Sequence, residues 1–291
     1  MKFEPLALAH RPLFEAYGPK EAESADSGFV NLWLWRHARR IEVAEFSGFL
    51  CIRQTYPGSD PVMLMPLGQG DLSAVLEALR QIFSQQGYPL TFRALNESMK
   101  AALSEAWPDR FIFTPTPEHD DYLYETQALI ELKGRAYHAK KNFVNRFEAA
   151  YGLHYESLNA DNFSETLAFL EQWFARAPYP ADAEKQGILD LLAHRELFNC
   201  TYNLLRAEGE IAAFTVGEAL SSDRVVIHVE KGDSRFPGSY QAINRTHLER
   251  EWAHTKIVNR EEDLGIEGLK KAKLSYHPVG FVHKYRARLV D

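Results

Sequence analysis

The sequence is poor in cysteine and has no long run of apolar residues. Only Cys51 and Cys200 occur among its 291 residues, and they do not have the spacing of a zinc site. This excludes a disulfide-rich scaffold and favours two reduced thiols in a reducing compartment. No stretch approaches the ~18 apolar residues that cross a membrane, and residues 1–9 lack the pattern of a signal peptide. We therefore expect a cytoplasmic protein without stable membrane insertion.

Several functional motifs are also missing. The chain has no P-loop, dinucleotide fingerprint or nucleophile elbow, and no short repeat or low-complexity tract. Its histidines are scattered without metal-ligand spacing, so we expect no metal and no required cofactor. The oligomeric state is left open, with a monomer as the simplest case. A hydrophobic content of 45% and a charged content of 25% are typical of a globular protein.

The first half of the chain alternates predicted strands and helices. Short β-rich runs bounded by turn residues predict strands at 41–46, 48–54, 62–67, 90–95 and 110–114. Asp71 and Asn96 are predicted N-caps of two helices, because each stands directly before a helical segment.

The second half repeats this alternation with more helix. Predicted helices cover 135–151, 161–174, 183–197 and 239–254, with Asp161 as the cap of the second, and a short helix follows Gly265. Predicted strands cover 153–158, 201–206, 211–220, 224–231, 256–258 and 281–290.

The order of these elements indicates the fold class. The strands from 201 to 231 form a predicted antiparallel meander, followed by a loop that opens a helix and then by strand, helix and strand. This is the order of an acyltransferase lobe of the GNAT type. We predict a mixed α/β (α+β) fold of two such lobes, residues 1–125 and 126–291, each a mixed sheet flanked by helices.

The densest polar cluster begins where the strand 256–258 ends. Ligands bind at strand ends in open α/β sheets, so Asn259, Arg260, Glu261 and Asp263 are our candidate catalytic residues. Either Glu261 or Asp263 is a candidate general base, with Arg260 paired inward. A charged turn that caps the next helix, with Asp263 as its N-cap, explains the same pattern. Both interpretations stay open.

Basic residues concentrate in two segments of a chain whose net charge is −7. Residues 131–148 hold five Lys or Arg against two Glu, and residues 270–288 hold six and no acid. Together they favour a shared anionic ligand such as a phosphate, whereas an ordinary solvated helix face explains either one alone. The candidate donor-binding residues in these segments are Lys140, Lys141, Asn145, Arg146, Lys273, Ser275 and Tyr276.

A third segment opens the helix predicted at 239–254. The amides of a helix start can hold a phosphate, and GNAT enzymes hold the coenzyme A pyrophosphate there with an Arg/Gln-x-x-Gly-x-Gly/Ala pattern. This chain has Arg235 and Gly238, but Tyr240 fills the last small position, which weakens the match to a coenzyme A user. The candidate substrate-binding residues here and on the preceding strand are Arg235, Gly238, Gln241, Glu230 and Lys231. His228, two residues before Glu230, is interpreted as ordinary strand alternation.

The same segments carry a family resemblance. They are 121–124, 129–135, 140–142, 145–147, 228–231, 240–244, 259–265 and 273–276. On them the chain resembles the stand-alone bacterial members of the phosphatidylglycerol lysyltransferase C-terminal family. The resemblance implies tandem GNAT lobes akin to the Fem aminoacyltransferases, which move an amino acid from aminoacyl-tRNA to an acceptor amine or hydroxyl. It also implies a cleft in the C-terminal lobe where charged residues orient the acceptor.

Two functions are compatible with these features. The first is an acyl- or aminoacyltransferase that uses aminoacyl-tRNA or acyl-CoA as donor, with Glu261 or Asp263 accepting a proton. The second is a non-catalytic module that binds tRNA or a small anionic metabolite. Substitution of either acid separates them, because binding alone survives the loss of a proton acceptor.

Overall fold

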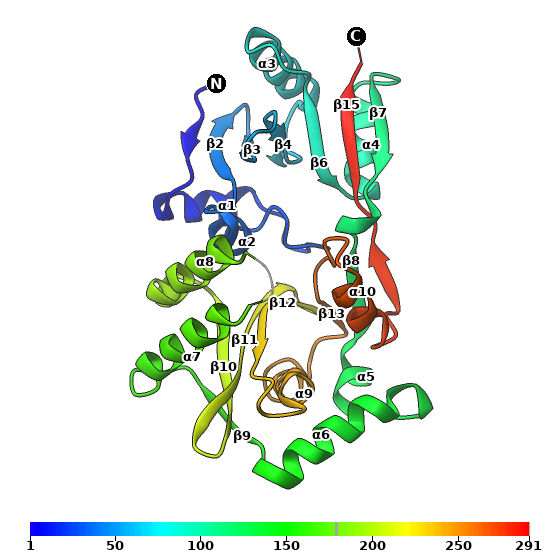
Figure 1. Ribbon diagram of the computed structural model, residues 1–291. Coiled ribbons are helices and arrows are strands. Elements are labelled where there is room, and N and C mark those ends of the chain that lie inside the picture. The colour runs from blue at the N-terminus through cyan, green and yellow to red at the C-terminus, as the bar shows by residue number, and fades with distance from the viewer. Residues whose placement is uncertain (178–179, 291) are drawn as a thin grey trace. The chain divides into compact units, whose positions relative to one another are not determined.

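The computed structural model describes residues 1–177 and 180–290, and the chain divides into two compact units (Figure 1). The first comprises Met1–Asp120, Gln186–Leu191 and the C-terminal segment from Val282. The second comprises Asp121–Lys185 and Leu192–Phe281. Each contains a mixed sheet with helices around it, which confirms the predicted mixed α/β class.

The sheet of the first unit has the strand order β1-β2-β3-β4-β6-β15-β7, with β5 paired to β3. β4 and β6 run parallel, whereas the other pairs are antiparallel. Its strands are β1 (Glu4–Pro5), β2 (Arg40–Phe46), β3 (Phe49–Thr55), β4 (Val62–Met63), β5 (Leu67–Gly68), β6 (Thr91–Leu95), β7 (Phe111–Pro115) and β15 (Tyr285–Leu289). Its helices include α1 (Arg11–Tyr17), α2 (Phe29–Trp35), α3 (Leu72–Gln85) and α4 (Glu97–Ala106).

Local sequence signals determine where two of these helices begin. The Asp71 carboxylate accepts a hydrogen bond from the Ala74 amide at 3.1 Å, and the Asn96 side chain accepts one from the Met99 amide at 2.9 Å. Both N-cap predictions are therefore confirmed. The apolar face of α3 then packs into the core of the unit, because Leu76, Leu79 and Phe83 are fully buried.

The strand predicted at 281–290 is two strands in the structure. β14 (Gly280–Val282) pairs with β8, whereas β15 lies between β6 and β7. The chain changes direction at His283 and Lys284, where Asp120 accepts a hydrogen bond from the Lys284 amide at 2.8 Å. The last strand therefore adds to the sheet of the first unit rather than to that of the segment in which it was predicted.

The sheet of the second unit has the order β14-β8-β13-β12-β11-β10-β9. Its further strands are β8 (Asp121–Glu125), β9 (His154–Ser157), β10 (Cys200–Ala207), β11 (Glu210–Ser221), β12 (Arg224–Gly232) and β13 (Ile257–Asn259). Its helices include α5 (Thr126–Glu131), α6 (His138–Tyr151), α7 (Phe163–Ala175), α9 (Ser239–Glu251) and α10 (Glu267–Leu274). Helix α8 (Asp182–Ala193) is divided between the units, because its residues Gln186–Leu191 belong to the first.

The predicted meander forms the centre of this sheet. β10, β11 and β12 pair antiparallel in succession, as expected. Glu208 and Gly209 both have positive φ, at 53° and 82°, as a tight hairpin turn between twisted strands requires. Residues Ile211–Gly217 of β11 are buried in succession, because α9 and α7 both pack on these strands.

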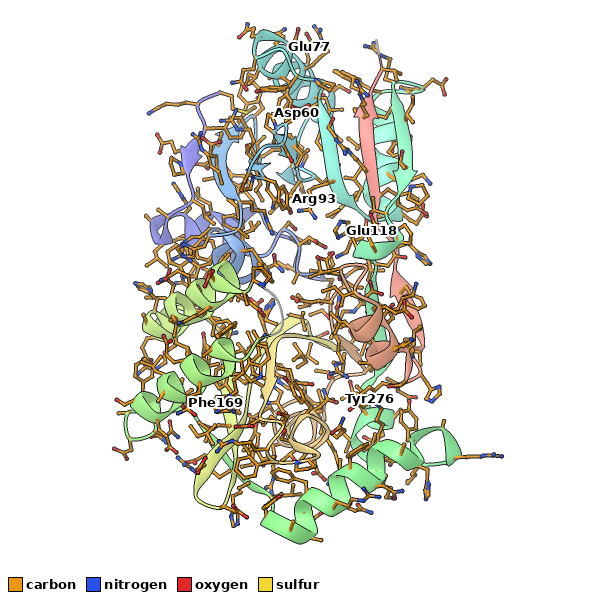
Figure 2. The ribbon with its side chains drawn as sticks, in the orientation of Figure 1. Asp60, Glu77, Arg93, Glu118, Phe169 and Tyr276 are labelled. Carbon is orange, nitrogen blue, oxygen red and sulfur yellow. The ribbon has the colours of Figure 1, made fainter. Side chains whose placement is uncertain are left out.

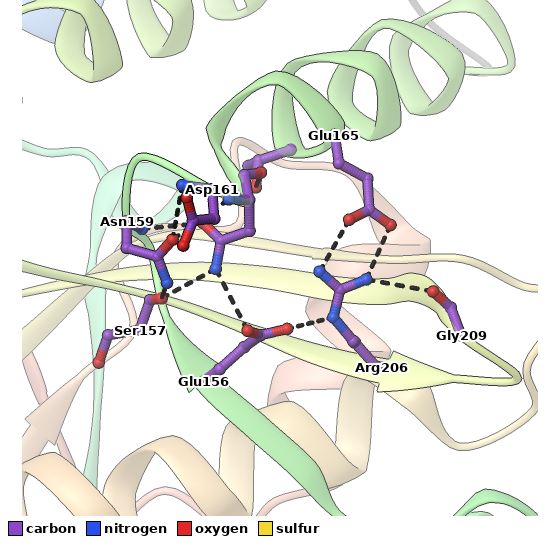
Figure 3. Close-up of polar contacts among 9 residues, drawn as sticks. Glu156, Ser157, Asn159, Asp161, Glu165, Arg206 and Gly209 are labelled. Atoms are coloured by element: carbon purple, nitrogen blue, oxygen red, sulfur yellow. Dashed lines mark hydrogen bonds and ion pairs between the residues drawn. The ribbon is translucent and has the colours of Figure 1, made fainter.

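The beginning of α7 differs from the prediction. Its N-cap is Asn162 rather than Asp161. The Asn159 side chain accepts hydrogen bonds from the amides of Asp161 and Asn162 at 2.8 and 3.2 Å, so this short turn delays the helix (Figure 3). Arg206 on β10 then holds Glu165 in the first turn with two hydrogen bonds of 2.8 and 2.7 Å.

Candidate functional site

The turn after β13 is held rigidly by buried polar groups. β12 and β13 run parallel as far as Val226 and Asn259, and Asn259, fully buried, donates to Asp121 at 2.8 Å and accepts from the Glu261 amide at 2.7 Å. Lys273 on α10 donates to the carbonyl of Glu261 at 2.9 Å and also to those of residues 260 and 262. Burial lowers the pKa of Lys273 to about 8.

Arg260 points into the unit, as predicted. Its guanidinium lies 2.8 Å from the Glu230 carboxylate, and both side chains are 13% exposed. Asn244 on α9 donates to the other oxygen of Glu230 at 2.8 Å. The guanidinium also lies over the ring of Tyr276, 4.9 Å from its centroid. Burial disfavours the charge, but Glu230 together with Tyr276 and Tyr124 outweighs burial and raises the pKa of Arg260.

Glu261 is one end of a carboxylate–imidazole–carboxylate row. Its Oε1 lies 2.9 Å from Nδ1 of His228, and Oε2 of Glu218 lies 2.8 Å from Nε2 of the same ring. The His228 side chain is 0% exposed, whereas those of Glu218 and Glu261 are 22% and 21% exposed. Burial alone lowers the pKa of His228, but the two carboxylates reverse the effect and raise it to about 10.

Asp263 has a different environment from Glu261. It is 3% exposed and accepts hydrogen bonds from the Tyr122 hydroxyl and from the Gly265 amide. The N-cap of α10 is Ile266, so the interpretation of Asp263 as its cap is wrong. The side chain instead closes the turn between β13 and α10, and Glu261 is the more accessible acid.

Lys140 brings the basic segment to this turn. Its ammonium lies 4.3 Å from the centroid of the Tyr276 ring (labelled in Figure 2), which also contacts Arg260. Burial, then the nearby Arg260 charge, lower the pKa of Lys140. Tyr137 donates to the Tyr276 carbonyl at 3.1 Å and fixes the start of α6 beside it. Lys140 of the first basic segment therefore lies against Tyr276 of the second.

The other candidate residues of the segment 131–148 are Lys141, Asn145 and Arg146. Lys141 borders a surface hollow of about 510 Å³, whose other lining residues are Leu132, Lys133, Gly134, Arg135 and His138. Asn145 and Arg146 are exposed on α6. Within the residues that the structure describes, neither contacts the turn.

The loop before α9 packs closely against α6 at Gly238. Gly238 is the N-cap of α9 with φ 96°, and a Cβ there would lie 2.5 Å from the backbone oxygen of Phe143. Helix α6 therefore covers this helix start. Arg235 forms ion pairs of 2.8 Å with Asp233 and Glu210, and Gln241 follows on α9. Arg235 and Gly238 thus have their contacts outside the Asn259–Asp263 turn.

Two further candidates have structural contacts. Lys231 alternates with Glu230 along β12, so it faces the opposite side of the sheet, where it pairs with Glu184 at 2.7 Å and lies 4.0 Å from the Trp173 ring centroid. Ser275 donates to the Ala272 carbonyl at the end of α10.

Sequence reasoning missed His228, Glu218 and Asn244. Strand alternation does place His228 and Glu230 on one face of β12, and this could have linked them to the consecutive Arg260 and Glu261. Glu218 gives no such signal, because its position beside His228 depends on a register shift between β11 and β12 at Val216/Gly217.

Comparisons with known proteins agree with this architecture. A family model described as phosphatidylglycerol lysyltransferase, C-terminal, matches residues 20–288. A solved protein of unknown function from Bacteroides thetaiotaomicron is 33% identical over 100% of both chains, with a TM-score of 0.91. An uncharacterized protein of Mycoplasmoides gallisepticum is 24% identical over 178 residues. That match covers 58% of this chain and 56% of the relative, so the chain spans little more than half of the curated relative.

More distant structures share the fold. L-PGS from Bacillus licheniformis has a TM-score of 0.68 at 17% identity, covering 98% of this chain and 92% of its own. A tandem GNAT protein from the clavulanic acid pathway has a TM-score of 0.50 at 10% identity, covering 100% and 99%. The predicted tandem GNAT-like fold is therefore confirmed. Among the described residues, no helix is long and apolar enough for a membrane crossing, and no group of three or more His, Cys, Asp or Glu is arranged for a metal ion.

Proposed function

The chain belongs to the phosphatidylglycerol lysyltransferase C-terminal family, and from this premise we propose that it transfers an acyl or aminoacyl group to an amine or hydroxyl acceptor at the Asn259–Asp263 turn. Family and fold point to a GNAT-like transferase. The observation that carries the proposal is the pair of charged contacts beside this turn, Glu230 with Arg260 and His228 with Glu261. Charged groups with perturbed pKa values that gather in one place, here beside the carboxyl end of β13, are typical of functional sites.

The accessible acid has a direct role in this proposal. The acceptor nitrogen or oxygen attacks the donor carbonyl carbon, the new bond to that carbon forms, and the bond to the donor oxygen or sulfur breaks. Glu261 receives the proton lost by the acceptor and returns it to the leaving atom. Asp263 is less suited to this role, because Tyr122 and the Gly265 amide already occupy its two oxygens.

Cations beside the turn suit the donor. Lys140 and Arg260 share the Tyr276 ring, and a cation here stabilises negative charge that develops on the carbonyl oxygen. The hollow lined by Lys133, Arg135 and Lys141 extends this positive region towards the donor's phosphates. Arg146, predicted with them, lies on the exposed side of α6 and suits contact with a longer polyanion.

The closed start of α9 favours an aminoacyl-tRNA over acyl-CoA as donor. A pyrophosphate needs free amides at the helix start, but the Phe143 backbone lies against Gly238 and Arg235 is engaged by Asp233 and Glu210. A tRNA end does not depend on that loop. Acyl-CoA stays the second donor of the proposal.

Donor consumption decides between these donors. The purified chain is incubated with a radiolabelled pool of aminoacyl-tRNA or with acetyl-CoA, each with and without a mixture of amine and hydroxyl acceptors, and loss of the ester or thioester is followed. We expect tRNA ester loss, reduced ~10²–10⁴-fold in Glu261→Gln, the range of a lost general base. Glu267→Gln, an exposed glutamate on α10, is the matched control. Full activity of Glu261→Gln contradicts the proposed role.

The hollow also supports a non-catalytic alternative, a module that binds tRNA or a small anionic metabolite. Native mass spectrometry of the purified chain identifies a retained nucleotide, coenzyme A or tRNA. If tRNA binds equally to the parent and to Glu261→Gln while no donor is consumed, the alternative replaces the transferase.

A further inference from the structure

His228 has a buried side chain that lies between two acids, Glu218 and Glu261. The proposed reaction gives this histidine no role. We infer that His228 is a positioning residue, a lasting imidazolium cation, anchored by Glu218, that holds the Glu261 carboxylate in place to accept the acceptor's proton. The inference rests on the proposed function for its last step only, because the charge and the geometry belong to the folded chain.

Hydrogen bonds to two carboxylates favour the charged form of the ring. Nδ1 of His228 contacts Glu261 at 2.9 Å and Nε2 contacts Glu218 at 2.8 Å. An ionised carboxylate only accepts hydrogen bonds, so both ring nitrogens must donate, and a ring that donates from both nitrogens is the imidazolium. The ring is 0% exposed, so the two carboxylates take the place of water around its charge.

The three residues come from three separate segments. Glu218 lies on β11, His228 lies on β12 where the register shifts, and Glu261 follows β13. The backbone of Glu261 has φ 57°, and it is fixed by Asn259 through its amide and by Lys273 through its carbonyl. The imidazolium then fixes the side chain. In the described part of the chain, hydrogen bonds to the Glu261 carboxylate use Oε1 alone, which leaves Oε2 to receive the proton of the acceptor substrate.

The surroundings of the ring keep its charge constant near neutral pH. Besides Glu218 and Glu261, the neighbouring ionisable groups are Cys200 and Tyr202 on β10 beside Glu218, and Lys273 beside Glu261. Burial raises the pKa of both Cys200 and Tyr202, so both stay neutral. The pKa of His228 is about 10, since the two carboxylates outweigh burial.

An imidazolium is well suited to positioning and poorly suited to being the base. It has no lone pair with which to accept a proton, so the proton that leaves the acceptor goes to Glu261. When Glu261 is protonated, His228 remains paired with Glu218. The proton then returns from Glu261 to the leaving atom, and no residue other than Glu261 changes charge in the cycle.

NMR of the full-length chain measures the charge directly. We would record long-range ¹H–¹⁵N spectra of the histidine rings from pH 5.5 to 9, with His228→Gln to assign the signals. We expect two protonated nitrogens for His228 across the whole range. His247, buried and accepting from Trp252 at 3.1 Å, is the neutral reference in the same spectra. A His228 midpoint near ~6.5, the ordinary value for histidine, or a neutral tautomer overturns the inference.

Glu218→Gln provides the second arm, because it removes one of the two counter-charges without touching Glu261. We expect the His228 midpoint to fall by at least one pH unit. In the donor-consumption assay we expect kcat to fall ~10–100-fold, since a misplaced group near the chemistry costs about this much, with the KM for donor little changed. Unchanged kcat with a charged His228 overturns the positioning role. If no donor is ever consumed, the spectra alone decide on the imidazolium, and only the proposed function fails.

Discussion

Removal of the Arg260 side chain is expected to destabilise the second unit strongly. Arg260→Ala leaves Glu230, only 13% exposed, without its cation at 2.8 Å. Loss of one partner of a buried ion pair costs ~3–5 kcal/mol. Asn244 keeps one hydrogen bond to the Glu230 carboxylate, which offsets ~1.5–3 kcal/mol of the loss, whereas the lost contact with the Tyr276 ring adds ~0.5–2 kcal/mol. We therefore expect a loss of about 2–4 kcal/mol in the free energy of unfolding.

Thermal and urea unfolding of the purified chain measure this loss. In a unit of this size, ~1 kcal/mol lowers Tm by ~2–4 °C, so we expect a fall of roughly 5–15 °C. Lys271→Ala is the matched control, because its ion pair with Glu267 at 3.3 Å is 75% and 73% exposed, and such pairs contribute ~0–1 kcal/mol.

A second substitution separates lost packing from an orphaned charge. Glu230→Gln in the Arg260→Ala background removes the unpaired carboxylate, so part of the lost Tm should return. An Arg260→Ala variant that melts with the parent, while Glu261→Gln falls by several degrees, refutes the reasoning and makes the turn a structural cap.

Three more outcomes follow from the contacts of Asp263 and His228 and from the charge of the hollow. Asp263→Asn should lower Tm by several degrees, because the carboxylate is 3% exposed and bonded to Tyr122 and the Gly265 amide; a Tm equal to the parent's contradicts this. The pKa of His228 is raised from 6.5 to about 10, so its stabilising effect should be complete below pH ~6.5 and lost as pH rises towards about 10; the Tm difference between parent and His228→Gln should shrink over that window, and a constant difference counts against it. Binding of tRNA should weaken by orders of magnitude between ~50 and ~200 mM salt if several phosphates are engaged; Arg135→Ala with Lys141→Ala, which removes two cations from the hollow, should flatten this dependence more than Lys270→Ala with Lys271→Ala on exposed α10.

The sequence predicts the local structure well where a short segment carries the whole signal. Asp71 and Asn96 cap their helices through their own side chains, and Glu208–Gly209 supplies the positive φ values of its hairpin. Each of these depends on a few neighbouring residues. The cap at Asp161 was wrong because the competing acceptor, Asn159, is just as local and has the same preference for helix starts.

Long-range pairing explains what the sequence could not provide. The turn at Asn259–Asp263 was recognised by its charge density, and the inward direction of Arg260 was expected. Its partner Glu230 was named as a candidate, but its contact with Arg260 depends on the register of β12 and β13. The pairing of His228 with Glu218 needs a register shift that no local pattern encodes. The place of β15 between β6 and β7 is likewise a matter of topology.

The contacts of Lys273 restrict which amino acids α10 can accept at that position. It is the buried side chain of a helix whose other residues are exposed or half-exposed, and it donates to three backbone carbonyls at once. Methionine matches its length without a donor, and a guanidinium is planar where three separate oxygens surround one nitrogen. In a saturation library, the rest of this helix should accept most polar residues, whereas position 273 should accept lysine alone. Such a library would therefore report the geometry of the neighbouring turn through a helix that is otherwise free to vary.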